Sequence, residues 1–237
     1  MPVLDPSVVL AEENFDVIIL ASVPGYDALL TMCKEFGIES DRIVDKYVLF
    51  PLESRRIFLQ NLAVLIEARS LTGSVAEAGV FEGDFAKYIN RYFPERALYL
   101  FDTFDGFALQ DVEMEQSGAL SEAKVGDYRG TSARNVMKKM PYPERVQICP
   151  GYFPDSAMDI EDEFCFANLD LDLYLPTKRG LDYFSSRMVS GGVLLVHDYF
   201  ADNFRGPRKA VDEFLSLHEN YLGMPIGDGL SLLIAGF

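Results

Sequence analysis

The sequence predicts a doubly wound α/β fold, with a mostly parallel sheet of seven strands that carries an antiparallel hairpin at one edge. Five short apolar runs alternate with segments of helical periodicity, which is the pattern of parallel strands joined by crossover helices. The closing stretch, residues 221–237, has the pattern of two strands joined by Gly-Asp-Gly, a hairpin signal. With 237 residues, of which 49% are hydrophobic, the chain is long enough for one such domain and a small appendage.

The appendage is expected in residues 1–50. The apolar run 15–21 predicts a buried strand, the segment 26–37 has helical spacing and ends at a glycine, and the segment 41–48 predicts a second short strand. Together they predict a β-α-β unit of about 50 residues, which is shorter than a usual domain. Such a unit could dock on the main domain, hold a homodimer together or belong to a larger domain.

The main domain is expected in residues 51–237 and begins with a helix at 51–73. Its five buried strands are predicted at residues 74–78, 97–102, 145–149, 164–170 and 192–198. Helices are predicted near residues 84–92, 132–140, 177–184 and 207–217. Because helices and strands alternate, the helices are expected to cover both faces of the sheet.

One connection in the main domain is unusually long. Residues 105–130 are polar and only weakly periodic. Loops of this length in compact domains are usually functional, as lids are, or disordered. We expect a lid over the ligand site, with a short helix in it, and a passive surface excursion is the alternative.

Charge and cysteine content exclude several classes of protein. The chain has 37 acidic and 21 basic residues and a formal net charge of -16, so its surface repels phosphates and no nucleic-acid partner is expected. Cys33, Cys149 and Cys165 are scattered without paired spacing, as is typical of reduced thiols in a cytoplasmic protein. The sequence has no recognisable signal peptide and no run of about 18 apolar residues, so no membrane span is expected.

A glycine-containing turn follows the first strand of the main domain. Glu77 lies in that strand, and Gly79 and Gly83 follow it in the pattern E-x-G-x-x-x-G. Asp102, at the end of the next strand, is placed to accept hydrogen bonds from the ribose hydroxyls of a nucleoside. Because the spacing differs from G-x-G-x-x-G, NAD and FAD are disfavoured and S-adenosylmethionine fits. The alternative is that these glycines belong to an ordinary strand-to-helix turn.

Titratable side chains are expected at two further strand ends. Asp170 and Asp172 follow one strand, and His197 and Asp198 end the next. Acids gathered in this way raise one another's pKa unless a cation neutralises them, and oxygen-rich clusters suit Mg²⁺ or Ca²⁺. A single aspartate would more simply cap the following helix. Two such strand ends together favour a site.

Together these segments resemble the macrocin O-methyltransferase family, which comprises S-adenosylmethionine-dependent enzymes that methylate sugar hydroxyls. The matching segments are GSVAEAGVFEGDFAKYI, LYLFDTFDGF, PGYFPDS, NLDLDLYLPT and SGGVLLVHDYFADNFRGPRKAVDEF. The resemblance runs from about Leu52 to the end of the chain and leaves the first 50 residues outside it. It implies a class I methyltransferase-like fold for the main domain.

The resemblance implies roles for the strand-end residues. Asp170 would ligate a metal, and Asp172 would be the general base. The family usually has two metal-ligating acids before a tyrosine in the next strand. Here Asp198 matches the second acid, whereas His197 replaces the first. A neutral imidazole can also ligate but weakens the preference for Mg²⁺, and without a metal His197 could itself be the catalytic base.

The resemblance also implies a cofactor pocket. Its expected residues are Glu77, Ala78, Gly79, Val80, Phe81, Gly83, Asp102, Thr103, Gly106, Ser132, Gly151, Tyr152 and Asp170. Ser132 opens a predicted helix and would serve equally well as its N-cap. Arg205 and Arg208 could meet an anionic group of the acceptor or could be solvated surface charges.

We therefore expect an O-methyltransferase that transfers the methyl group of S-adenosylmethionine to a small-molecule sugar acceptor. The acceptor would be a nucleotide sugar, a glycoside or a polysaccharide precursor, and Mg²⁺ or another divalent cation would assist. A catechol-type O-methyltransferase and a non-catalytic module that binds a nucleoside are the alternatives. A nicotinamide-dependent oxidoreductase is the weakest alternative, because the glycine spacing is wrong for it.

Overall fold

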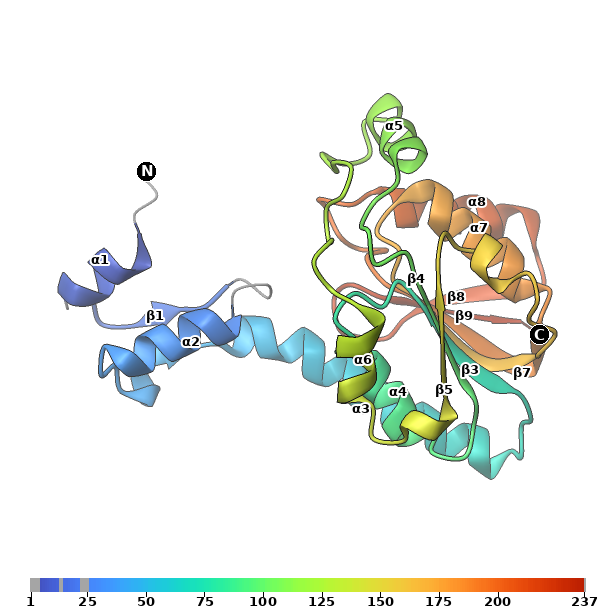
Figure 1. Ribbon diagram of the computed structural model, residues 1–237, viewed down its shortest axis with the longest axis horizontal. Coiled ribbons are helices and arrows are strands. Elements are labelled where there is room, and N and C mark those ends of the chain that lie inside the picture. The colour runs from blue at the N-terminus through green and yellow to red at the C-terminus, as the bar shows by residue number, and fades with distance from the viewer. Residues whose placement is uncertain (1–4, 13–14, 22–25, 237) are drawn as a thin grey trace. The chain divides into compact units, whose positions relative to one another are not determined.

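The computed structural model describes residues 5–12, 15–21 and 26–236 (Figure 1). The chain divides into two compact units, with the boundary between Ser54 and Arg55. Helix α3 (Lys46–Ala68) runs across this boundary in sequence. Among the described residues, no helix is both long and apolar enough to span a membrane.

The first unit is a small β-α-β arrangement preceded by a helix. Its elements are α1 (Pro6–Glu12), β1 (Ile18–Ile19), α2 (Tyr26–Glu35) and β2 (Ile43–Val44). The two strands pair in parallel, which confirms the predicted β-α-β unit. Its buried core consists of Leu10, Leu20, Cys33 and Ile38.

The predicted bounds in this unit were wrong at several points. The strand expected at 15–21 has only two residues, and α1 was not predicted, although Asp5 accepts a hydrogen bond from the Ser7 backbone at 2.8 Å in the manner of a helix cap. The strand expected at 41–48 comprises only Ile43–Val44, because α3 begins at Lys46 and the Asp45 carbonyl already accepts helical bonds. Two-residue strands carry no measurable period, so the sequence could not delimit them.

The second unit contains a seven-stranded sheet, as predicted. Its strands are β3 (Ser74–Ala78), β4 (Leu98–Asp102), β5 (Val146–Pro150), β6 (Phe164–Leu169), β7 (Met188–Val196), β8 (Tyr221–Pro225) and β9 (Leu232–Gly236). Their order is β5-β4-β3-β6-β7-β9-β8. The pairs from β5 to β7 are parallel, whereas β9 is antiparallel to β7 and β8. Because the strand order reverses at β3, the carboxyl ends of β3 and its neighbours border the crevice that binds ligands in such sheets.

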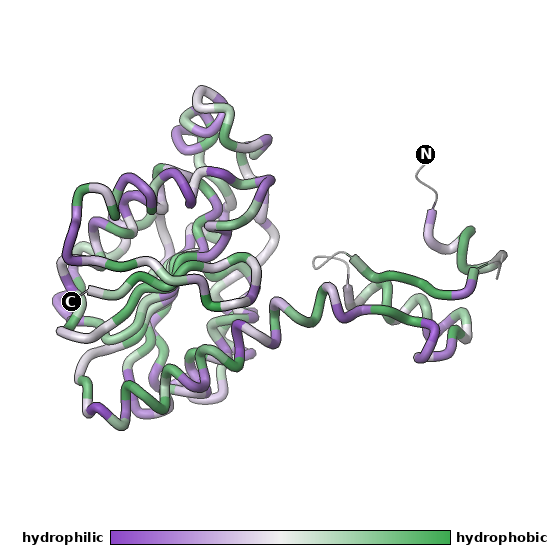
Figure 2. Tube along the Cα trace, turned by 180° about the vertical axis from the view of Figure 1, so that it is seen from behind, coloured by the Kyte–Doolittle hydropathy of each residue, from purple (hydrophilic) through white to green (hydrophobic). Residues whose placement is uncertain are grey.

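Helices cover both faces of this sheet (Figure 1). On one face lie α3, α4 (Ala86–Tyr92) and α6 (Ala133–Lys139), and on the other lie α7 (Tyr174–Ser185) and α8 (Gly206–Leu217). Every residue of β3 and β6 is buried, as expected for central parallel strands covered on both faces. Figure 2 accordingly shows hydrophobic residues concentrated along the central strands.

The helix predicted at 51–73 begins earlier, at Lys46. Proline is favoured in the first turn of a helix, which is why Pro51 suggested a start there. In the structure Pro51 lies inside α3 instead.

The long segment 105–130 contains one helix, α5 (Leu109–Ser117), in line with the expected short helix. Two acidic side chains anchor this helix. Glu115 is fully buried and accepts hydrogen bonds from the Tyr174 backbone at 2.6 Å and from the Ser121 hydroxyl at 2.9 Å. Asp111 accepts a hydrogen bond from the Tyr152 hydroxyl at 2.7 Å. The segment is therefore pinned to the start of α7 and to the loop after β5, and its role as a lid stays a prediction.

Candidate active site

The turn after β3 depends on two glycines in the left-handed region. Gly79 (φ 83°) lies so close to the end of β6 that a Cβ atom there would be 1.8 Å from the carbonyl oxygen of Asp170. Gly83 (φ 78°) has no room either, since a Cβ atom would lie 2.9 Å from a methyl of Val136. In this structure both positions need glycine because another segment of the chain itself packs too closely to leave room for a side chain.

Asp102, at the end of β4, holds this turn in place. Its Oδ2 accepts hydrogen bonds from the backbone N–H groups of Val80 and Phe81, both at 2.8 Å. Its Oδ1 accepts one from the Phe104 backbone at 2.7 Å. A carboxylate offers about four lone-pair sites, so Asp102 can still accept a hydrogen bond from a ligand. The Ala78 carbonyl accepts the Asp170 N–H at 2.8 Å, which joins this turn to the end of β6.

Three further residues of the expected cofactor pocket lie next to Asp102. The Thr103 hydroxyl donates to the Gly106 carbonyl at 3.1 Å, and the Gly151 N–H donates to the Asp102 carbonyl at 2.9 Å. A Cβ atom on Gly106 would lie 2.2 Å from the Asp127 carbonyl, so this glycine also permits a close approach of two segments.

Two other expected cofactor residues have partners within the chain. Ser132 accepts a hydrogen bond from the Asn135 backbone at 3.3 Å, so it caps α6. The Tyr152 hydroxyl is engaged by Asp111, and the guanidinium of Arg179 lies 5.5 Å from the centre of its ring. Contact of either residue with a cofactor stays a prediction.

Glu77, inside β3, is almost completely buried, with 1% of its surface exposed. Its Oε1 accepts a hydrogen bond from the Asn168 amide at 2.8 Å, while its buried Oε2 has no partner among the described residues. Burial, followed by the nearby Asp170 carboxylate, raises the pKa of Glu77 to about 8. Glu77 is therefore a largely neutral acid at pH 7 when no ligand is bound.

The ends of β6 and β7 bring together the predicted metal ligands. His197 Nδ1 lies 3.0 Å from Asp170 Oδ1 and 3.0 Å from Asp198 Oδ2. This nitrogen is buried, and despite the short distances it has no hydrogen bond of good geometry among the described residues. One ligand atom from each of the three side chains lies within 4.8 Å of the other two. The three side chains are therefore close enough together to bind one metal ion.

The protonation of this cluster is set by opposing effects. Burial alone would lower the pKa of His197, but the Asp170 and Asp198 carboxylates outweigh it and raise the pKa of His197 to about 10. Burial alone would raise the pKa of Asp170, but His197 and Arg55 hold it well below its usual range. For Asp172, burial and then the Asp198 and Asp170 charges raise the pKa well above that of a free aspartate.

Two of these aspartates have strained backbones. Asp172 (φ 57°) and Asp198 (φ 59°) both occupy the left-handed region, which non-glycine residues rarely adopt. Such strain is concentrated at functional sites, where the surrounding structure enforces it. The observation therefore agrees with a site at these two strand ends.

Arg55, in α3, is a member of this site that sequence reasoning missed. Its Nη2 lies 2.9 Å from Asn168 Oδ1 and 3.0 Å from Asp170 Oδ2, and its guanidinium lies 3.9 Å from the ring centre of Phe85. The sequence does contain a hint of this role, because the spacing of Arg55 and the buried Leu59 places both on the same face of the helix. A charged residue on an apolar stripe needs a buried partner.

Arg55 also links the two parts of the site. Glu77 bonds Asn168, Asn168 bonds Arg55, Arg55 pairs with Asp170, and Asp170 faces His197. The result is a continuous, largely buried series of polar contacts from the central strand β3 to the end of β7. Such a series fixes the orientation of each member, since every buried polar group needs its partner.

The two arginines that follow β7 are engaged with the chain itself. The Arg205 guanidinium donates to the Ala119 carbonyl. Arg208 lies 3.8 Å from Asp212 and 5.7 Å from the ring centre of Tyr199. Neither contact tests the expected role toward an anionic acceptor group, which stays a prediction.

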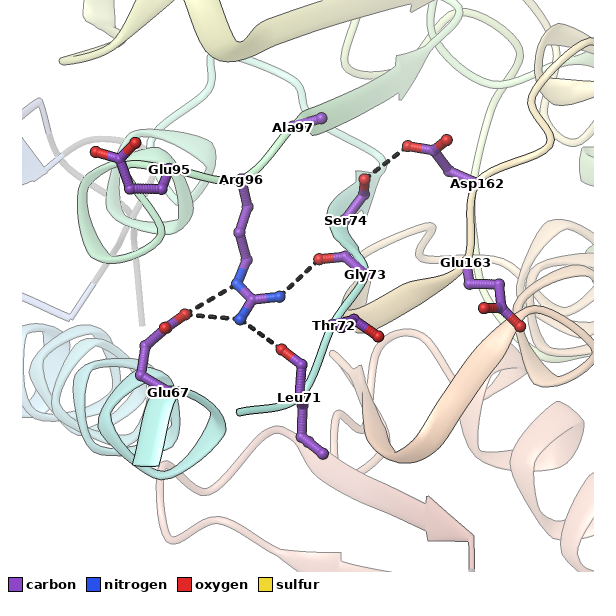
Figure 3. A pocket seen from close by; sticks show the side chains of 10 residues that line it. All are labelled: Glu67, Leu71, Thr72, Gly73, Ser74, Glu95, Arg96, Ala97, Asp162 and Glu163. Carbon is purple, nitrogen blue, oxygen red and sulfur yellow. Dashed lines mark hydrogen bonds and ion pairs between the residues drawn. The ribbon is translucent and has the colours of Figure 1, made fainter. Parts of the chain in front are cut away.

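The open cavity shown in Figure 3 has a volume of about 670 Å³ and lies at the other end of the sheet. It is lined by residues at the amino ends of β3 and β4. Its central cation, Arg96, is already bound by Glu67 and by the carbonyl oxygens of Leu71 and Gly73. Because this arginine ties the start of β4 to the end of α3, we interpret it as a structural residue.

Comparison with known proteins identifies the family of this chain. Residues 53–227 match the family model described as macrocin-O-methyltransferase (TylF). No significant match was found among curated proteins.

Solved structures share the fold at low sequence identity. One described as the O-methyltransferase NovP is 19% identical, covers 77% of this chain and 79% of its own, and has a TM-score of 0.62. The calicheamicin methyltransferase CalS11 is 17% identical, covers 97% and 91%, and has a TM-score of 0.61. An SAH-bound methyltransferase from Podospora anserina, PaMTH1, is 15% identical, covers 94% and 100%, and has a TM-score of 0.51. These likenesses confirm the predicted methyltransferase-like fold.

The family match covers most of the chain, and its range includes Arg55 and every strand-end residue described above. The predicted family and the predicted enzyme class are thereby confirmed. This chain belongs to the macrocin-O-methyltransferase (TylF) family and is an O-methyltransferase.

Proposed function

We propose that this enzyme transfers the methyl group of S-adenosylmethionine to a hydroxyl of a sugar acceptor, with Asp172 as general base. The proposal rests on the observation that the expected cofactor turn and the expected metal ligands lie at the same edge of the sheet. The turn 79–83 is held there by Asp102, and the cluster of Asp170, His197 and Asp198 lies beside it. The family supplies the reaction class.

The cofactor is proposed to bind at the turn 79–83. Asp102 keeps lone pairs for the ribose hydroxyls, and Glu77 keeps an unpaired buried oxygen that a ligand donor could satisfy. The PaMTH1 structure, which shares the fold, is described as SAH-bound, which supports a cofactor of this class.

Asp170, His197 and Asp198 fit a divalent cation. The buried His197 Nδ1 has no hydrogen bond of good geometry to a described residue, although two carboxylate oxygens lie 3.0 Å away, which is the arrangement of ligands around a shared ion. A cation held there would supply a Lewis acid that lowers the pKa of an acceptor hydroxyl. With one nitrogen among oxygen donors, the site suits Mn²⁺ as well as Mg²⁺.

Asp172 is the proposed proton acceptor. The acceptor oxygen forms a bond to the methyl carbon while the sulfur–carbon bond breaks, and its proton passes to the Asp172 carboxylate. Burial and the neighbouring carboxylates raise the pKa of Asp172, which makes its carboxylate a stronger base than a free aspartate. Because His197 is a proposed ligand of the cation, Asp172 is favoured over His197 as the base.

The acceptor is proposed to be a sugar carried on a small molecule. The family is named for a macrocin O-methyltransferase, and one CalS11 structure is described as a TDP-rhamnose 3'-O-methyltransferase. Both are statements about related proteins, and a nucleotide sugar, a glycoside and a polysaccharide precursor remain the candidates here. The cytoplasmic location, the lack of a nucleic-acid partner and a homodimer also stay predictions.

The test begins with calorimetry of S-adenosylmethionine binding, with Mg²⁺, with Mn²⁺ and with EDTA. Transfer of a labelled methyl group is then measured with methyl glycosides and with catechol as acceptors. Wild type is compared with Asp172→Asn and with Asp182→Asn, an exposed aspartate on α7 that serves as the control.

Cofactor binding, transfer to a glycoside, and loss of transfer by about 10²- to 10⁴-fold in Asp172→Asn alone would support the proposal. Transfer to catechol but to no glycoside would overturn the sugar acceptor. Absence of cofactor binding under every metal condition would point to the non-catalytic alternative.

A further inference from the structure

Four aromatic rings gather beside the candidate active site. They are Phe81, Phe107, Tyr128 and Phe204. Tyr128 is at the centre, with its ring centre 5.4 Å from that of Phe81, 5.2 Å from Phe107 and 6.5 Å from Phe204. The rings come from the turn after β3, from the two ends of the segment 105–130 and from the loop after β7. We call these four residues the aromatic cluster.

The aromatic cluster borders both halves of the site. Phe81 belongs to the turn that Asp102 holds. The other half is reached through Phe107 and Phe204, which pack against a buried cluster that contains Leu173, the residue after Asp172. The aromatic cluster therefore adjoins the proposed cofactor turn through Phe81 and the residue next to the proposed base through Phe107 and Phe204.

Tyr128 is available to a ligand. Tyr128 is 43% exposed and Phe81 is 41% exposed, although both rings are packed against other aromatic rings. The Tyr128 hydroxyl makes no hydrogen bond to any described residue. A phenol with a raised pKa remains protonated at pH 7, and its O–H is therefore free to donate to a ligand oxygen.

The position of Tyr128 is fixed by its neighbours. Its backbone is in the left-handed region (φ 63°), which is strained for a tyrosine. The preceding residue is held by Phe107, whose N–H donates to the Asp127 carbonyl at 3.1 Å, and Gly126 donates back to Phe107 at 3.0 Å. An isolated antiparallel β-bridge between Ser121 and Phe204 connects the segment 105–130 to the loop after β7. Strain that is held from several sides is a mark of functional positions.

We propose that the aromatic cluster is the subsite for the acceptor ring, with Tyr128 packed on the C–H face of a pyranose and its hydroxyl donating to an acceptor oxygen. This inference rests on the proposed function and names the group that holds the sugar. A pyranose presents apolar C–H groups on its face and hydroxyls on its rim. An exposed tyrosine ring with a free hydroxyl, next to the proposed cofactor turn, matches both features.

The test uses saturation-transfer NMR, which detects weak binding without turnover. The probes are methyl glycosides of a hexose and of a 6-deoxyhexose, with catechol as the aromatic comparison, each in the presence of SAH and Mg²⁺. The variants are Tyr128→Ala and Tyr128→Phe. Tyr142→Ala is the control, because Tyr142 is similarly exposed, at 39%, and Asn90 holds it through its backbone.

We expect saturation of pyranose ring protons in wild type and in Tyr142→Ala, and its loss in Tyr128→Ala. Tyr128→Phe should keep the contact but weaken glycoside binding by about 2- to 10-fold, the range of one net hydrogen bond. SAH affinity, measured by calorimetry, should be unchanged in all variants.

Any of the following results would overturn the inference: equal glycoside signals in wild type and Tyr128→Ala, a loss of SAH binding in Tyr128→Ala, or Tyr128-dependent binding of catechol without any glycoside. Glycoside probes that give no signal with SAH bound would also overturn it. Failure of the proposed function is distinguishable, since it would show as wild-type protein that binds neither SAH nor S-adenosylmethionine.

Discussion

The Arg55 guanidinium lies 3.0 Å from the Asp170 carboxylate, a contact between α3 and the end of β6. It occupies Asp170 Oδ2 and leaves Oδ1 directed at His197. One oxygen of Asp170 is therefore bound to Arg55, and the other oxygen is available to the proposed cation site. Because both partners are largely buried, removing one leaves an uncompensated charge.

Arg55→Met should lower the free energy of unfolding by about 3–5 kcal/mol, the usual cost of breaking a buried ion pair. Methionine keeps a stem that can pack on Phe85, so the loss reports mainly on the charge. Urea unfolding without divalent cations measures it. Arg56→Met is the matched control, because Arg56 is the adjacent, partly exposed arginine and bonds Tyr92. Equal losses in the two variants would contradict a special role for the Arg55–Asp170 pair.

His197→Asp should make the cluster all-oxygen and shift its metal preference. Carboxylate ligands suit Mg²⁺, whereas a nitrogen ligand favours transition metals. We expect the ratio of Mn²⁺ to Mg²⁺ affinity, measured by calorimetry, to fall several-fold. His218→Gln, which alters the only other histidine in the chain, should leave that ratio unchanged. A ratio that is the same in wild type and His197→Asp would argue against His197 as a ligand.

The buried Glu77 should make stability depend on pH. Its pKa is about 8 in the folded protein and about 4.3 in an unfolded chain. Between these two pKa values, Glu77 keeps its proton in the folded state but has lost it in the unfolded chain. The free energy of unfolding therefore falls as pH rises through this range. The contribution is fully present below about pH 4.3 and lost as pH passes about 8.

Glu77→Gln should flatten this slope, since glutamine can still accept the Asn168 hydrogen bond but does not titrate. Urea unfolding of the cofactor-free protein between about pH 5.5 and about pH 8.5 measures the slope. Glu113→Gln, at an exposed position on α5, is the control and should keep the wild-type slope. If Glu77→Gln keeps that slope too, Glu77 is ionised in the folded protein.

Gly79→Ala should be far more costly than Gly227→Ala, although both glycines have positive φ (83° and 90°). A Cβ atom on Gly227 would have no neighbour within 4 Å among the described residues, so only backbone strain of about 1–2 kcal/mol is expected there. At Gly79 a Cβ atom would meet backbone at 1.8 Å and must push β3 away from β6, which should cost about 4 kcal/mol or more. Thermal unfolding of both variants compares them, and similar melting temperatures would contradict the close approach.

Much of the fold was predictable because its signals are local. The strands β3, β4, β6 and β7 are short apolar runs, and their polar ends follow directly in the sequence, as Asp102, Asp170 and Asp198 do. The topology of parallel strands then brings those ends to one edge. Boundaries were less predictable where the signal was weak, as in the two-residue strands of the first unit or at Pro51 inside α3.

The sequence by itself determined the alternation of strands and helices, the glycine turn and the acids at the strand ends, since these depend on neighbours along the chain. Only the tertiary structure decided that Arg55 pairs with Asn168 and Asp170, which lie 113 and 115 residues away. It also decided that Tyr128 lies among rings from two other segments and from the opposite end of its own. Such contacts arise when hydrophobic packing brings distant segments together, and no periodicity in one segment records which partner it will meet.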